Sequence, residues 1–101
     1  MSKLSVMGSF TCRAGKHREM ESVLAAMVEA ARGEAGVEVY SYHRGDDDTY
    51  WFFAIMADEA SMQGHGQSEA MQAAMADFGA LVERPPEMWT ARPTAALGIG
   101  L

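Results

Sequence analysis

The chain has few of the features that mark proteins of oxidising or membranous environments. Cys12 is the single cysteine in 101 residues, so no internal disulfide can form. No apolar run is long enough to span a bilayer, and the first residues lack the apolar core and small-residue cleavage site of a secretory signal. We therefore expect a cytoplasmic protein that does not enter a membrane.

Basic residues and recognisable catalytic motifs are also scarce. Eight Lys and Arg residues stand against fourteen Asp and Glu residues, which gives a net charge of −6 and makes nucleic acid an unexpected partner. No set of His, Cys or carboxylate residues has the spacing of a metal site, and no phosphate loop or nucleophile elbow is present. We expect no metal and no cofactor.

Apolar residues, in contrast, make up 49% of the chain, enough for a packed core in one domain. We place that domain at residues 1–92 and interpret the apolar, Gly-broken residues 93–101 as a C-terminal arm that lies on a neighbouring surface. Within the domain, alternating residues predict strands and a 3.6-residue period predicts helices. The predicted elements are a strand at 4–12, a helix at 16–33, strands at 37–44 and 49–57, a short helix capped by Asp58, a longer helix capped by Ser68, and a strand at 87–92.

The third strand carries the most informative pattern. Tyr50 to Ala57 reads YWFFAIMA, with no alternation between apolar and polar residues, so both of its faces should be covered. The β-α-β-β-α-β order predicts an α+β ferredoxin-like sandwich with both long helices on one sheet face. The other face then needs a cover, and we expect a second copy of the chain, giving a homodimeric α/β barrel.

Several local signals, taken in order, resemble the antibiotic biosynthesis monooxygenase superfamily, whose members are small dimeric α+β barrels. The likeness runs from Phe10 to about Arg92. The residues that carry it are the turn Ala14-Gly15-Lys16, the segment Glu34-Ala35-Gly36-Val37 followed by Tyr40, the aromatic third strand, the spaced residues Asp58, Ser61 and His65, and the pair Pro85-Pro86.

The resemblance implies a cofactor-independent monooxygenase that oxidises a phenolic, quinol or polycyclic aromatic molecule. His65 is the candidate catalytic base, because an imidazole titrates near neutral pH. The competing interpretation is an exposed loop histidine, or one that caps a backbone group. Ala54 and Met56 stand where many members carry a glutamate and a Trp or Tyr. This departure keeps open a non-catalytic alternative, a small-ligand-binding or structural dimer of the same fold, and a weaker third possibility of haem binding by His65.

The substrate site is also implied by the resemblance. Both side-chain sets of the third strand are apolar, so its pattern does not tell which set faces the helices. The family analogy points the Met56 set toward a cleft on the helix side. The predicted substrate-binding residues are Phe52, Met56, Met71, Met75 and Phe78.

Other candidate residues receive structural interpretations. We expect His17 on the surface, His43 in a solvated ion pair and Cys12 buried in a strand. The run Asp46-Asp47-Asp48 is interpreted as a solvated hairpin tip. The three tyrosines, Tyr40, Tyr42 and Tyr50, either orient a ligand or pack at strand ends and the dimer seam, and packing is favoured.

Overall fold

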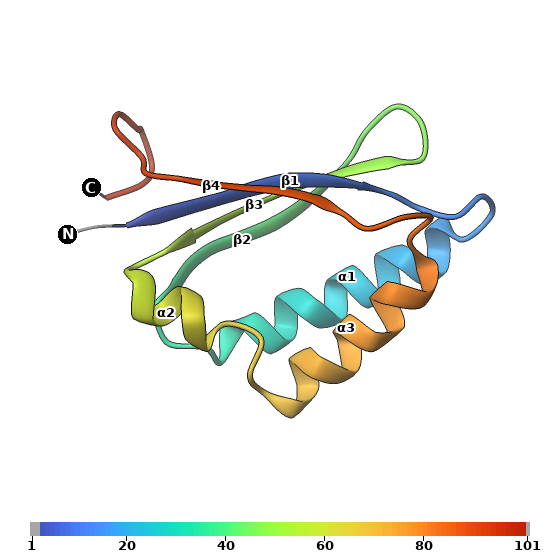
Figure 1. Cartoon of the computed structure of the whole chain (residues 1–101), viewed down its shortest axis with the longest axis horizontal. Helices are drawn as coiled ribbons and strands as arrows, with labels where there is room; N and C mark the ends of the chain where they lie inside the picture. The colour runs from blue at the N-terminus through green and yellow to red at the C-terminus, as the bar shows by residue number, and fades with distance from the viewer. Residues whose placement is uncertain (1–2, 101) are drawn as a thin grey trace.

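One antiparallel sheet of four strands lies over a layer of helices, and no helix covers its other face within the described part of the chain (Figure 1). The computed structural model describes residues 3–100. It confirms the predicted α+β ferredoxin-like order, including the short helix after Asp58. The elements are β1 (Leu4–Thr11), α1 (His17–Arg32), β2 (Val37–Arg44), β3 (Thr49–Met56), α2 (Glu59–Gly64), α3 (Glu69–Leu81) and β4 (Glu87–Ala91).

The strand order is β2-β3-β1-β4, so β2 and β4 are the two edges. In the central pair, Leu4 lies opposite Met56, Val6 opposite Ala54 and Phe10 opposite Tyr50. All six of these side chains are buried. Tyr50, Phe52, Ala54 and Met56 therefore form the helix-facing set of β3, which is the orientation that the family analogy implied.

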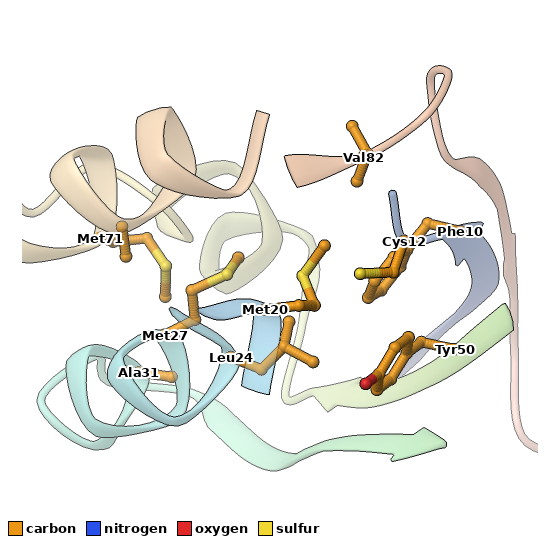
Figure 2. Packing of buried hydrophobic residues seen from close by; sticks show 10 residues of the cluster. Phe10, Cys12, Met20, Leu24, Met27, Ala31, Tyr50, Met71 and Val82 are labelled. Atoms are coloured by element: carbon orange, nitrogen blue, oxygen red, sulfur yellow. The ribbon is translucent and has the colours of Figure 1, made fainter. Parts of the chain in front are cut away.

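The core between sheet and helices depends on one stripe of α1. Met20, Leu24, Met27 and Ala31 are buried at the helical spacing that the sequence predicted. In Figure 2, Met71 of α3 points toward α1, next to Met27, while Phe10, Cys12 and Tyr50 lie on the side of the sheet, beyond Met20. The buried position of Cys12 is confirmed.

The buried stripe of α3 differs from the predicted one. Helical spacing predicts a buried stripe of Met71, Met75, Phe78, Leu81 and Val82 here. The Met75 side chain is nevertheless 48% exposed, and the small Ala74 is buried together with Met71. Ala74 belongs to the same core cluster as Leu24 and Met27 of α1, so this position of α3 is filled by a small side chain. The Met75 side chain instead lines the cleft that is described below.

The uncovered sheet face carries large apolar side chains. Trp51 and Trp89 are each more than half exposed, and Met7 is also exposed. Ile55 lies on the same face but is fully buried. Lys3, which precedes β1, forms an ion pair with Glu38 of β2. The covering of this face by a second copy of the chain stays a prediction.

Side chains define the starts of α2 and α3 as predicted. Asp58 accepts a hydrogen bond from the Ser61 backbone at 2.8 Å, and Ser68 accepts one from Met71 at 3.1 Å. After β4, residues 92–100 form neither helix nor strand, and Leu97 is fully exposed. Their contact with a neighbouring surface stays a prediction, and residue 101, like residues 1 and 2, lies outside the described residues.

Gly36 fixes the position of α2 against the start of β2. Its φ is +87°, a region that favours glycine, and a Cβ added there would lie 1.8 Å from the Ser61 Oγ atom. The Ala57 backbone amide also donates to the Gly36 carbonyl at 2.7 Å. The absence of a side chain at Gly36 therefore lets α2 approach the segment that precedes β2.

Gly36→Ala should lower the free energy of unfolding by roughly 3 kcal/mol, because it adds left-handed backbone strain to a steric clash. Gly15→Ala is the matched control, since Gly15 has a φ of +77° but no atom within 4 Å of an added Cβ. The control should lose about 1 kcal/mol. Urea unfolding of both variants measures the difference, and equal losses would contradict the proposed contact with Ser61. Ser61→Gly should partly restore the Gly36→Ala variant.

Candidate functional site

A cleft of about 410 Å³ lies between the helix-facing side of the sheet and α2 and α3. Its walls are predominantly apolar, and five of the nine methionines of the chain contribute to them. The lining residues are Val6, Phe10, Met27, Tyr40, Tyr42, Phe52, Ala54, Met56, Met62, His65, Gly66, Met75, Phe78, Gly79, Val82, Pro86 and Met88.

The structure brings most of the predicted site residues together at this cleft. Phe52 and Met56 line it from β3, Met75 and Phe78 line it from α3, and His65 lines it from the loop between α2 and α3. Met71 does not line the cleft, because it is fully buried against α1 (Figure 2). The roles assigned to these residues remain predictions.

Gly8 on β1 makes room for one wall of the cleft. It lies opposite Phe52, and a Cβ added to it would lie 2.8 Å from the Phe52 ring and 2.1 Å from the Glu87 carbonyl oxygen. The Phe52 ring can therefore extend across β1 only because this position has no side chain. A flat aromatic wall is the result.

His65 is held by a carboxylate from another part of the chain. The Glu34 Oε1 atom lies 2.6 Å from His65 Nδ1, and its Oε2 atom accepts a hydrogen bond from the Gly66 backbone at 3.1 Å. Both side chains are largely buried, with 11% of Glu34 and 20% of His65 exposed. When Nδ1 donates to the carboxylate, the neutral ring presents Nε2 as a base. His65 is therefore a fixed group at the cleft and not a free loop residue.

Two tyrosines of β2 add hydroxyl groups beside His65. The ring of Tyr40 contacts the His65 ring edge to face, with centroids 5.2 Å apart. The Tyr40 and Tyr42 hydroxyl groups lie 2.7 Å apart, and that of Tyr42 also lies 3.8 Å from the Met27 sulfur. Burial raises the pKa of both tyrosines, so they stay neutral hydrogen-bond donors at physiological pH.

The family model for antibiotic biosynthesis monooxygenases matches residues 4–77, well over half of the chain. The chain belongs to the antibiotic biosynthesis monooxygenase family. No curated protein matches it. The match spans β1 to the middle of α3 and so includes Glu34, both tyrosines of the cleft and His65.

Solved structures share the fold of this antibiotic biosynthesis monooxygenase family member over nearly its whole length. A Caulobacter crescentus CB15 protein named for the same family has a TM-score of 0.87 at 20% identity, covering 93% of this chain and 92% of its own. Rv0793 from Mycobacterium tuberculosis has a TM-score of 0.83 at 22% identity, covering 94% and 98%. NE2512 from Nitrosomonas europaea, a protein of unknown function, has a TM-score of 0.82 at 26% identity, covering 99% and 98%.

The residues of β3 that line the cleft in this family member, Phe52, Ala54 and Met56, are all apolar. Ala54 and Met56 are buried and line it, so the positions that differ from many family members form apolar wall. The polar groups come instead from β2 and from the loop after α2. From the sequence, Glu34 had no predicted role, and Tyr40 and Tyr42 were expected to pack. The segment that begins at Glu34 is part of the family resemblance, and this was the signal that could have pointed to Glu34.

His17 corrects another expectation, because it is not a surface residue. Its Nδ1 atom lies 2.8 Å from the Tyr50 hydroxyl and its Nε2 atom 2.6 Å from Asp48 Oδ1, with 19% of its side chain exposed. The Tyr50 hydroxyl donates to Glu21 at 2.7 Å, and this bond lowers the pKa of Glu21. The cluster ties the start of α1 to the β2–β3 hairpin, so Asp48 is more than a solvated tip residue.

The remaining candidates are structural. His43 is exposed and bonds to Ser41 Oγ at 2.9 Å, in place of the expected ion pair. Burial raises the pKa of the Cys12 thiol. Among residues 3–100, no group of three or more His, Cys, Asp or Glu residues could hold a metal ion. No helix in that range is long and apolar enough to cross a membrane.

Tyr42 also borders a second hollow, on the outside of the sheet edge. This open groove lies between α1 and β2, and its floor includes Leu24, Ala25 and Val28. Glu21 and Arg44, which form an ion pair of 3.1 Å, lie at one end. The Tyr42 side chain therefore lines the inner cleft and the outer groove.

The tyrosines should ionise only when the protein unfolds. Burial is the main cause that raises the pKa of Tyr40, Tyr42 and Tyr50, which are all the tyrosines of the chain. Because the folded-state pKa lies above the unfolded value of about 10, their contribution to stability is complete below that pH and is lost as the pH rises above it. Absorbance at 295 nm and circular dichroism should change together during an alkaline titration. Tyrosinate absorbance near pH 10 with intact circular dichroism would contradict this.

Proposed function

We propose that the protein is a cofactor-independent monooxygenase for a phenolic, quinol or polycyclic aromatic molecule, with His65 as the base. The observation that supports this most is the His65–Glu34 pair at the edge of an apolar cleft. A carboxylate that orients an imidazole makes the ring a better-placed base. The apolar wall of Phe52, Phe78 and the methionines suits a flat aromatic ligand.

The proposed reaction needs one proton acceptor and a substrate that supplies its own electrons. His65 Nε2 takes the phenolic proton, and the phenolate forms a carbon–oxygen bond with dioxygen. The protonated His65 then returns its proton to the peroxide anion, which gives a ring hydroperoxide. The oxygen–oxygen bond then breaks as the carbon loses its hydrogen, so that water leaves and a carbonyl remains. One phenol and one dioxygen thus give one quinone and one water, and the substrate supplies all four electrons.

The cleft supports these steps in two ways. Its apolar lining removes water from the phenolate, which strengthens the effect of nearby hydrogen-bond donors. The Tyr40 hydroxyl, kept neutral by burial, supports the developing oxyanion as a donor. These contributions do not require the polar residue that β3 lacks at Ala54.

Oxygen uptake with anthrone, measured on protein freed of metals, should depend on His65 and Glu34. His65→Ala should lower the rate by about 10²-fold or more, because a positioned base contributes at least this much. Glu34→Gln, which keeps the shape but removes the charge, should lower it less, because His65 stays in place with a weaker partner. The expected product is anthraquinone, with one dioxygen consumed per molecule.

Two exposed substitutions serve as controls. Gln67→Ala lies in the same loop as His65, and Glu29→Gln changes a carboxylate on α1 that pairs with Arg32 on the surface. Both should leave uptake unchanged. Equal rates for wild type and His65→Ala would remove His65 from the mechanism. Binding of the aromatic molecule without uptake would instead favour the non-catalytic small-ligand-binding dimer, which the apolar residues Ala54 and Met56 support.

The working unit in this proposal is a homodimer in the cytoplasm. The face of the sheet opposite the helices carries Met7, Trp51 and Trp89, all exposed in one chain. Large exposed apolar side chains gathered on one sheet face are typical of a partner surface. The free thiol of Cys12 agrees with a reducing compartment.

Sedimentation at micromolar concentration should therefore give twice the mass of 11.0 kDa. Trp89→Glu should shift the equilibrium to the monomer, because it places a charge in the buried interface. Gln72→Glu adds a negative charge to an exposed position of α3 and should leave the dimer intact. A monomeric wild type would refute the barrel.

A further inference from the structure

The strong hydrogen-bonding side chains of the cleft all lie at one end. Tyr40 and Tyr42 belong to the edge strand β2, and His65 contacts the Tyr40 ring. The Tyr40 and Tyr42 hydroxyl groups meet at 2.7 Å. A ligand atom that reaches one of these groups is therefore within a short distance of the others.

The opposite end of the cleft offers only apolar side chains. Three strand spacings separate β2 from β4, roughly 14 Å. Toward β1 and β4 the walls are formed by Val6, Phe10, Val82 and Met88. The thioether of methionine is only a weak hydrogen-bond acceptor. An oxygen placed at this end would lose its water without gaining a strong side-chain partner.

Two of the methionines that line the cleft also reach the surface of the molecule. Met75 of α3 and Met88 of β4 are both about half exposed, at 48% and 55%. Neither side chain offers a strong hydrogen bond to a ligand oxygen.

We infer that the cleft selects aromatic ligands whose oxygen functions share one edge, and binds them with that edge toward Tyr40 and His65. This rests on the proposed aromatic ligand class and adds the arrangement of its oxygens. A ring system with oxygens on neighbouring or facing positions along one edge gives each oxygen a partner. A ring system with oxygens at opposite ends leaves one unpaired in the apolar half, which weakens binding by roughly tenfold to a hundredfold.

Dihydroxynaphthalenes test this inference with ligands of identical size and composition. The 2,3- and 1,8-isomers have both oxygens on one edge, while the 2,6- and 1,5-isomers have them on opposite sides. Calorimetric titration under nitrogen measures binding alone, since the proposed reaction consumes dioxygen. The one-edge isomers should bind at least tenfold more tightly. Equal affinities, tighter binding of the opposed isomers, or no binding of any isomer would overturn the inference.

Tyr40→Phe identifies the group responsible. It removes one hydroxyl and keeps the ring that contacts His65, so the preference for the one-edge isomers should fall several-fold while binding of the opposed isomers stays nearly constant. Gln67→Ala, exposed in the neighbouring loop, should retain the full preference. An unchanged preference in Tyr40→Phe would contradict the assignment.

The outcome is separable from that of the oxygenase proposal. Selective anaerobic binding without oxygen uptake in air would support the inference and refute the reaction. Oxygen uptake without selectivity among the isomers would support the reaction and refute the inference.

Discussion

The bond between Glu34 and His65 is the contact on which the polar end of the cleft depends. Glu34 belongs to the turn between α1 and β2, and His65 to the turn between α2 and α3, 31 positions apart. The carboxylate uses one oxygen for the imidazole and the other for the Gly66 backbone, so it fixes the side chain and the loop together. Since Gly36 holds α2 against the same turn, the histidine has a defined place despite its glycine-rich surroundings.

The elements of the fold could be predicted because each is encoded by neighbouring residues. Asp58 and Ser68 cap their helices through bonds to residues three positions ahead, and the α1 stripe repeats at helical spacing. The observed ends of the strands and of α1 lie within one residue of the predicted ends. The side of β3 that faces the helices could not be predicted from its own residues, because Phe52 and Phe53 are equally apolar; the family resemblance supplied it.

The site was predicted only in part, because its decisive contacts join distant residues. His65 could be selected as a base from its residue type and its family position, but its partner Glu34 is set by how two loops meet. The surface position predicted for His17 was wrong for a similar reason, because its partners Tyr50 and Asp48 belong to the distant β2–β3 hairpin. For α3, periodicity alone treats Met75 and Ala74 as alternatives. The structure buries Ala74 in the core and leaves Met75 half exposed beside the cleft, which the sequence of α3 alone does not decide.

Tyr42 lines the inner cleft on one side and the outer groove beside α1 on the other. The two hollows, of about 410 Å³ and about 460 Å³, therefore share one aromatic side chain. A smaller residue at this position would enlarge both of them at once. The shape of the inner cleft is thus coupled to the surface beside α1.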